Sequence, residues 1–149
     1  MKRVFLILIT NSFDQVLDIS VIIVNYRSWA KLGKCLDSLS FIPQSLLSFE
    51  VIIVDNASND GILPKFQIAY PRFSFIQNTG NNGFAHGCNL GATKAGGEYL
   101  LFLNPDTVVN EESLVGMLKR ARSCNNHSII SCRQIREDGS EEKPYGNFL

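Results

Sequence analysis

Side chains that could bind a ligand follow three hydrophobic segments of this 149-residue chain. Asn25 ends the first segment, Asp55 follows the second, and Asp106 comes shortly after the third, two residues beyond Asn104. If the segments are parallel strands, their carboxyl ends meet at one edge of a sheet, which is where ligands bind in open α/β folds. A carboxylate at that edge can hold a divalent cation through oxygen contacts. We therefore expect a ligand site there, with Asp106 as its candidate metal ligand.

The segment that precedes Asp106 has the pattern of a buried strand that stops abruptly. Residues 99–103 form a continuous apolar run of the length that a central strand needs. Pro105 then lacks a backbone donor, so the strand cannot continue past it. Two alternatives stay open: residues 104–107 are only a turn followed by a helix cap, or Asn and Asp end the strands because they suit turns. The convergence of three polar strand ends favours a ligand site over both.

The order of the expected elements indicates the class of fold. Strands are expected at residues 18–25, 49–54, 73–77, 99–103 and 128–134, and helices at residues 29–39, 62–69, 85–94 and 111–123. Strands that alternate with helices need right-handed crossovers, which favours an α/β fold with a doubly wound, mostly parallel sheet between two layers of helices. No internal repeat or low-complexity linker divides the chain, so we expect one domain over residues 1–149.

The two ends of the chain lie outside this alternation. Residues 4–9 are apolar but too few to cross a bilayer, and no small-residue cleavage site of a secretory signal follows them. We expect residues 1–17 to form an extra edge strand or an arm, which could also pair with another subunit. Residues 135–149 are expected to form a hairpin and a tail. The spacing of the carboxylates in this segment is typical of a solvated hairpin.

Composition excludes several classes of function. Lys and Arg number 14 and so do Asp and Glu, and no basic run occurs, which argues against a nucleic-acid-binding surface. The four cysteines form no CxxC pair and only two histidines are present, which argues against a zinc site. Reduced thiols fit a cytoplasmic protein. We expect attachment to the inner face of a membrane to be peripheral at most.

Glycine recurs every four residues in the segment 81–91. Gly83, Gly87 and Gly91 lie along an expected helix, where each costs about 1 kcal/mol relative to alanine. Such spacing lets a helix approach a ligand or another backbone closely. Tight packing of the helix on the sheet is at least half of the explanation for glycine at positions 87 and 91. The segment is neither a dinucleotide-binding GxGxxG motif nor a phosphate-binding P-loop.

Taken together, four segments of the chain resemble the nucleotide-sugar-binding half of family 2 glycosyltransferases of the GT-A, Rossmann-like fold, in particular the rhamnosyltransferase-like branch. The segments are VIIVNYRS at 21–28, VIIVDNASNDG at 51–61, NNGFAHGCNLG at 81–91 and YLLFLNPDT at 99–107. The resemblance covers residues 19–140 and implies a nucleotide-sugar donor such as a UDP- or dTDP-sugar, a glycan or lipid-linked acceptor, and Mg²⁺ or Mn²⁺.

The resemblance also implies roles for individual residues. Asn25 and Tyr26 would line the pocket for the base. Asp55 would bind the base or the ribose, with Asn56 and Ser58 shaping its loop. The residues implied to contact the nucleotide-sugar or to lie beside it in the glycine-rich segment are Asn81, Gly83, Phe84 and Asn89.

The implied chemistry depends on a cation at the diphosphate. Asp106 would coordinate it, and Asn104 takes the place of the first Asp in the family's broader Asp-x-Asp motif, which leaves one carboxylate fewer. A divalent cation stabilises the charge that develops on a departing nucleoside diphosphate. A carboxylate is the usual base for the proton of the acceptor hydroxyl. These features would give single displacement with inversion at the anomeric carbon.

Family members usually continue well past residue 149 with the acceptor site and the general base. The resemblance therefore implies a truncated chain, and two hypotheses stay open. The chain is a glycosyltransferase, as a fragment of a longer enzyme or completed by a partner chain, or it is a nucleotide-sugar-binding module without transfer activity. Surface that a second half would cover favours self-association, so we expect a homodimer.

Overall fold

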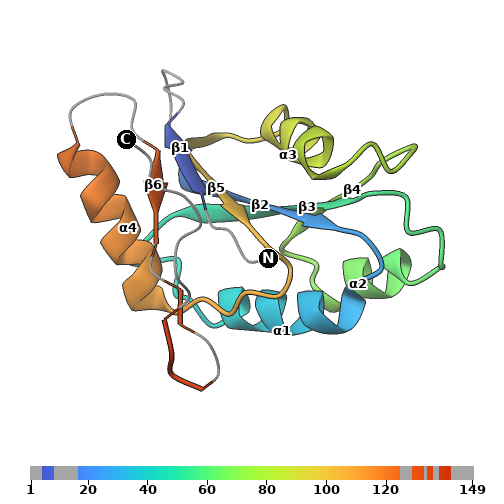
Figure 1. The fold of residues 1–149 in the computed structure, drawn as a ribbon, viewed down its shortest axis with the longest axis horizontal. Helices are drawn as coiled ribbons and strands as arrows, with labels where there is room; N and C mark the ends of the chain where they lie inside the picture. The colour runs from blue at the N-terminus through green and yellow to red at the C-terminus, as the bar shows by residue number, and fades with distance from the viewer. Residues whose placement is uncertain (1–4, 9–16, 125–128, 133, 136–137, 142–149) are drawn as a thin grey trace.

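A computed structural model describes residues 5–8, 17–124, 129–132, 134–135 and 138–141 of the chain. Among these residues a six-stranded sheet is flanked by helices (Figure 1). The strands are β1 (Phe5–Leu8), β2 (Leu17–Asn25), β3 (Phe49–Asp55), β4 (Ser74–Gln77), β5 (Gly97–Leu103) and β6 (Ile130–Ser131). The helices are α1 (Trp29–Ser40), α2 (Leu63–Ala69), α3 (Phe84–Ala92) and α4 (Glu111–Ser123).

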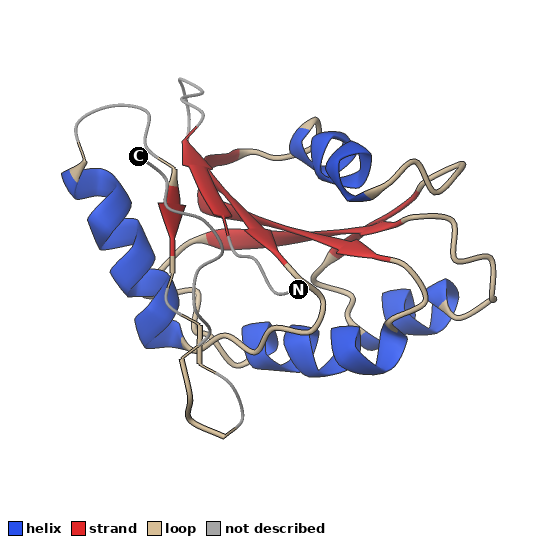
Figure 2. Cartoon of the chain, in the orientation of Figure 1, coloured by secondary structure: helices blue, strands red, loops and turns tan. Residues whose placement is uncertain are grey.

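Four parallel strands form the centre of the fold. The strand order is β4-β3-β2-β5-β1-β6, in which β4, β3, β2 and β5 are parallel neighbours. Helices α1 and α2 lie on one side of the sheet and α3 on the other (Figure 2). The predicted α/β fold, with a mostly parallel sheet between two helical layers, is confirmed.

The pleat of β2 divides the core into two parts. Ile19, Val21 and Ile23 face the larger cluster, which side chains of α1, α2 and α4 complete. Ile22 and Val24 face the smaller cluster, which contains Cys88 of α3. Successive side chains of a strand point to opposite faces of a sheet, so β-branched residues are buried on both sides of β2. This burial makes β2 the rigid centre from which the strand ends project.

The prediction that an extra N-terminal strand would lie at an edge of the sheet was wrong. Strand β1 lies between β5 and β6 and is antiparallel to both, with Phe5 opposite Phe102 and Leu6 opposite Ile130. The open side of β5 presents unpaired backbone N–H and C=O groups, and an apolar segment can satisfy them by strand pairing. The pairing that the structure describes is within one chain.

The C-terminal expectations are met in part. The strand expected at 128–134 is described as Ile130–Ser131 alone. Beyond it, an antiparallel bridge joins Ile135 to Glu141, and the backbone N–H of Ser140 donates to Asp138 Oδ1 at 2.9 Å, as in a hairpin turn. The remaining expectations for the two termini fall on residues outside the described ranges. In the described part of the chain, no helix is both long enough and apolar enough to cross a membrane.

Candidate functional site

The carboxyl ends of β2, β3 and β5 meet at one edge of the sheet, as the sequence predicts. Asn25 is paired with Asp55 in the last rung between β2 and β3. On the other side of β2, Leu103 ends β5 opposite Ile23, so the chain leads directly from this edge to Asp106. We call the polar residues at these three strand ends the strand-end cluster.

Asp55 connects two turns of this cluster. The residue is 1% exposed, and its carboxylate accepts hydrogen bonds from Asn25 Nδ2 at 3.2 Å, from the backbone N–H of Ser58 at 3.1 Å and from the Ser58 hydroxyl. Ser58 is itself buried, and its Oγ accepts from the backbone N–H of Arg27 at 3.0 Å. The Asp55 side chain therefore holds the turn after β2 against the turn after β3.

Both turns contain residues with left-handed backbone conformations. Arg27 has φ 51°, Ala57 has φ 58° and Asn59 has φ 49°. This conformation costs a residue with a side chain about 1–2 kcal/mol. Backbone strain of this kind persists where surrounding structure enforces it, and it is frequent at functional sites. Here the backbone N–H of Arg27 donates to Ser58 Oγ and that of Ala57 donates to the carbonyl of Asp55, which hold these two residues in place.

Asn56 extends the cluster to the opposite face of the sheet. The residue is 2% exposed, and its Nδ2 donates to the carbonyl of Gly83 at 3.0 Å and to Asn81 Oδ1 at 3.4 Å. Its Oδ1 accepts from Asn78 Nδ2 at 3.0 Å. Asp55 and Asn56 are neighbours in sequence, so one strand end fixes the turns beside α1 and also the glycine-rich loop before α3.

Asn78 is a polar residue at the end of a fourth strand, next to this cluster, that sequence reasoning missed. It follows β4 directly and is 7% exposed, and its backbone N–H donates to the carbonyl of Asp55 at 2.8 Å. The signal that could have found it is the one that singled out Asp55: a polar residue at the carboxyl end of a parallel strand.

Asp106 offers an unsatisfied oxygen at the same edge. Its Oδ1 is buried and has no hydrogen-bond partner within the described structure. Buried polar atoms are normally paired, so an orphaned carboxylate oxygen is suited to a ligand that is a cation. In the described ranges no three Asp, Glu, His or Cys side chains are grouped for a metal. A cation bound at Asp106 would therefore need oxygen ligands other than a cluster of such side chains.

A protonated thiol lies beneath this end of β5. Burial, together with the nearby charge of Asp106, raises the pKa of Cys35 in α1 to about 12. Its Sγ lies 4.0 Å from the carbonyl oxygen of Asn104. Cys35 is therefore neutral at physiological pH and supports the strand end by packing.

Most of the remaining predicted site residues are exposed to solvent. Tyr26 is 44% exposed, with the guanidinium carbon of Arg27 5.3 Å from its ring centroid, and Phe84 is 46% exposed. Asn81, Gly83 and Asn89 are exposed as well, and Asn104 is partly buried. Their implied contacts with a donor stay predictions.

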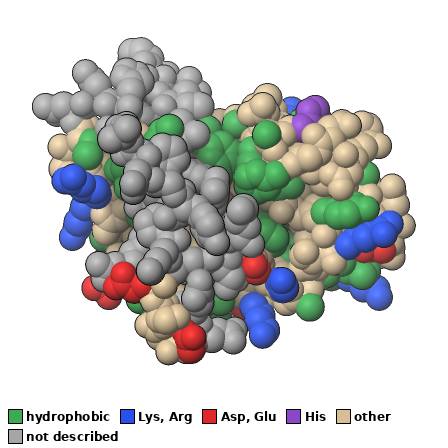
Figure 3. All heavy atoms as spheres, in the orientation of Figure 1, with side chains coloured by type: hydrophobic (Ala, Val, Ile, Leu, Met, Phe, Trp, Pro, Cys, Tyr) green, Lys and Arg blue, Asp and Glu red, His purple; other side chains and the backbone are tan. Residues whose placement is uncertain are grey.

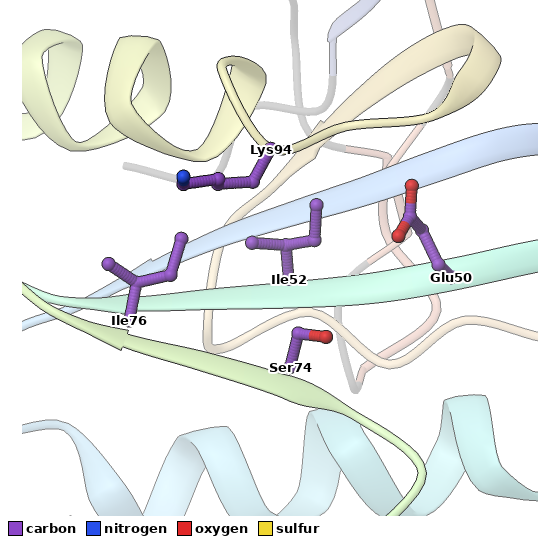
Figure 4. Close-up of a pocket in the computed structure, with 5 residues that line it drawn as sticks. All are labelled: Glu50, Ile52, Ser74, Ile76 and Lys94. Atoms are coloured by element: carbon purple, nitrogen blue, oxygen red, sulfur yellow. The ribbon is translucent and has the colours of Figure 1, made fainter.

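A separate hollow lies on the α3 side of the sheet (Figure 4). Its volume is about 230 Å³, and the residues that line it are Glu50, Ile52, Ser74, Ile76 and Lys94. Glu50 Oε1 already accepts hydrogen bonds from Ser20 Oγ at 2.6 Å and from the backbone N–H of Gly96 at 2.7 Å. Because Asp55 is an odd number of residues from Glu50 and Ile52 along β3, its side chain points to the opposite face. The hollow is therefore on the face of the sheet opposite to the Asp55 carboxylate.

Comparison with known proteins identifies the family. The family model described as glycosyl transferase family 2 matches residues 20–148. The chain belongs to glycosyl transferase family 2. Among its relatives are an uncharacterized glycosyltransferase of Haemophilus influenzae, 30% identical over 80% of this chain, and poly(ribitol-phosphate) beta-glucosyltransferase of Bacillus spizizenii, 33% identical over 87% of this chain. The chain spans 41% and 21%, respectively, of the length of these two relatives.

Solved structures of other transferases share the fold of this family 2 chain. S. aureus TarS 1-349 in complex with UDP-GlcNAc superposes with a TM-score of 0.59 at 28% identity, over 72% of this chain and 30% of the TarS chain. The mannosyltransferase PcManGT from Pyrobaculum calidifontis, in complex with GDP-Man and Mn²⁺, has a TM-score of 0.60 at 23% identity, over 73% of this chain and 35% of the other. The expected GT-A fold is confirmed.

Proposed function

We propose that the strand-end cluster binds a nucleotide-sugar donor and that the chain supplies the donor-binding part of a glycosyltransferase. The observation that carries this proposal is the buried, unpartnered oxygen of Asp106 at the edge where Asn25 and Asp55 meet. The UDP-GlcNAc complex of TarS, a protein 28% identical to this chain, supports a nucleotide-sugar as the ligand.

Each part of the cluster has a defined role in this proposal. The exposed ring of Tyr26 and the buried carboxylate of Asp55 face the nucleoside, and the loop at Asn81 and Gly83 contacts the sugar-diphosphate portion. Asp106 would hold Mg²⁺ or Mn²⁺ beside the diphosphate. When bound, this cation stabilises the negative charge of the departing nucleoside diphosphate.

We further propose that the reaction is a single displacement. The hydroxyl of a glycan or lipid-linked acceptor would form a bond to the anomeric carbon as the bond to the diphosphate breaks, which inverts that carbon. The acceptor proton would pass to a carboxylate base. In this proposal neither the acceptor site nor the base lies among the strand-end residues.

A second candidate is a donor-binding module without transfer activity. The matched region covers less than half of each relative named above, and the residues that we assign to donor binding lie within it. Release of UDP from UDP-GlcNAc in the presence of an acceptor distinguishes the two candidates, because a module that only binds the donor leaves it intact.

Calorimetric titration with UDP and with dTDP tests the proposed site. Both nucleotides are needed because the TarS complex contains UDP-GlcNAc, whereas the resemblance to rhamnosyltransferase-like enzymes favours dTDP-sugars. We expect Mn²⁺ to tighten binding to the wild type by at least about tenfold and Asp106→Asn to lose that gain. Glu112→Gln, which neutralises an exposed carboxylate of α4, is the control and should bind as the wild type does. A folded chain that binds neither nucleotide would contradict the proposal.

We also propose that the chain acts on the cytoplasmic side of a membrane as a homodimer or with a partner chain. Large apolar side chains that are exposed in the structure support association: Phe41 is 85% exposed and Ile68 is 81% exposed. Sedimentation at tens of micromolar tests the dimer, and a purely monomeric chain would refute it.

A further inference from the structure

We infer that the side-chain amides of Asn78 and Asn56 form a relay that positions the loop at residues 79–83 for the donor. We call this pair the amide relay. The inference rests on the proposed function, and it makes Asn78 a positioning residue of the same site. Asn78 itself need not touch the donor.

The relay has a fixed direction because backbone groups define both of its ends. The backbone N–H of Thr79 can only donate, and it donates to Asn78 Oδ1 at 2.9 Å. Asn78 Nδ2 must therefore be the donor to Asn56 Oδ1, at 3.0 Å. Asn56 Nδ2 then donates to the carbonyl of Gly83, which can only accept, at 3.0 Å.

The relay is anchored in the rigid part of the sheet. The backbone N–H of Asn56 donates to the carbonyl of Asn25 at 2.8 Å, and that of Asn78 donates to the carbonyl of Asp55 at 2.8 Å. Helix α3 packs directly against it, since a Cβ added to Gly87 would lie 3.2 Å from Asn56 Oδ1. Through these contacts β2, β3 and β4 hold the entry to α3.

The loop that the relay holds carries exposed residues of the proposed donor site. Asn81 Oδ1 accepts from the backbone N–H of Gly83 at 3.2 Å and from Asn56 Nδ2, so the conformation of the loop depends on Asn56. Gly83 has φ 89°, which few residues other than glycine adopt, and Phe84 follows it into α3. A change at Asn78 should therefore reach the donor site through Asn56.

Asn78→Asp tests the relay most sharply. The substitution keeps the shape of the side chain but replaces the donating Nδ2 by an oxygen that faces Asn56 Oδ1. A buried hydrogen bond becomes a repulsive contact, and we expect the dissociation constant for UDP with Mn²⁺ to rise by at least about tenfold. Gln67→Glu is the matched control, because it makes the same chemical change at an exposed position of α2. This control should bind UDP within about twofold of the wild type.

Two measurements separate positioning from general stability. Affinity is measured about 20 °C below the melting temperature of each variant, so that every chain is folded, and hydrogen exchange is followed at residues 79–84. We expect faster exchange confined to this loop in Asn78→Asp. A variant that melts earlier but binds UDP as tightly as the wild type would overturn the inference. If the aspartate variant does not fold, Asn78→Ser gives the same test, because the serine side chain is too short to reach Asn56.

Failure of the proposed function would look different. If the folded wild type binds no UDP, the donor site is refuted, and the exchange comparison still decides whether the relay holds the loop. Unchanged exchange at residues 79–84 in Asn78→Asp would refute the relay even if UDP binds to the wild type.

Discussion

Ser58, together with Asp55, joins the two turns of the strand-end cluster. Its buried hydroxyl accepts from the backbone N–H of Arg27 and donates to Asp55. Ser58→Ala leaves the buried Asp55 carboxylate and the Arg27 N–H without that partner, so we expect the free energy of unfolding to fall by about 1–3 kcal/mol. Chemical denaturation measures the change.

Ser45→Ala is the control for this substitution, because Ser45 is exposed. Its free energy of unfolding should stay within about 0.5 kcal/mol of the wild-type value. Equal stability of the two variants would show that the hydroxyl of Ser58 does not hold the turns together.

The carboxyl group of Asp18 should make the free energy of unfolding depend on pH. Partial burial favours a higher pKa for its carboxyl group, but hydrogen bonds from Ser48 and Arg122 outweigh burial and hold the pKa below 3.8. Because the folded-state pKa is the lower one, the stabilisation is complete above the unfolded-state pKa and is lost as the pH falls through the folded-state pKa.

Asp18→Asn should remove this pH-dependent stabilisation. We expect a loss of about 1 kcal/mol at pH 7, kept small because the Arg122 side chain is 51% exposed. Urea unfolding of both chains at pH 7 and at about pH 2.5 checks the sign, since the difference should shrink at the lower pH. A difference that grows on acidification would show that the ion pair is not what stabilises Asp18.

Individual site residues differ in whether their position could be predicted from the sequence. Asn25, Asp55 and Asp106 could be predicted to share an edge, because polar residues after parallel strands converge whatever the side-chain details. Asn78 was missed because its strand is short and half-exposed, so its position carried little weight. The orphaned oxygen of Asp106 is a matter of local geometry, which residue type and spacing do not determine.

At the scale of elements, helix α3 approaches β2 at two glycines. A Cβ added to Gly91 would lie 2.5 Å from Ile22 Cγ2, and one added to Gly87 would lie 2.7 Å from Val24 Cγ1. The interpretation that these glycines permit tight packing is therefore confirmed. Gly83 differs from both. Its φ is positive, and among the described residues no neighbour lies within 4 Å of an added Cβ, so its requirement is conformational.

Gly91→Ala should destabilise the protein even though alanine favours a helix. The new methyl would meet a β-branched side chain with little freedom to move, at a cost of about 1–3 kcal/mol that exceeds the helix-propensity gain of about 1 kcal/mol. Gly116→Ala in α4 is the matched control, because no neighbour outside its own helix backbone lies within 4 Å of its added Cβ in the described part of the chain. We expect the control to be neutral or up to about 1 kcal/mol more stable in chemical denaturation. Stabilisation by both substitutions would contradict the close approach of α3.

Strand β1 shows what the local pattern of an element leaves undetermined. An apolar run at residues 4–9 predicts a strand, but it does not specify the neighbours of that strand. The position between β5 and β6 follows from which backbone edges are still unpaired after the parallel strands have formed. That information belongs to the assembled sheet, so the prediction of an edge strand failed although the strand itself exists.

For the whole molecule, the fold was predictable because its signals repeat along the chain. Alternating strands and helices fix the parallel order, and buried branched residues on both faces of β2 identify it as central. Basic and acidic side chains are interspersed on the face shown in Figure 3, in keeping with the zero net charge of the sequence. The anionic donor that we propose would therefore be recognised by local groups and not by an overall positive charge.

The measurement that tests the central claim most directly is the mapping of amide chemical shifts in the isotope-labelled chain as UDP and Mg²⁺ are added. The account predicts that the largest changes fall at the carboxyl ends of β2, β3 and β5, around Asn25, Asp55 and Asp106, and in the loop at residues 79–84. Binding that instead shifts the amides around the hollow at Glu50 and Lys94, and leaves the strand ends unchanged, would contradict it.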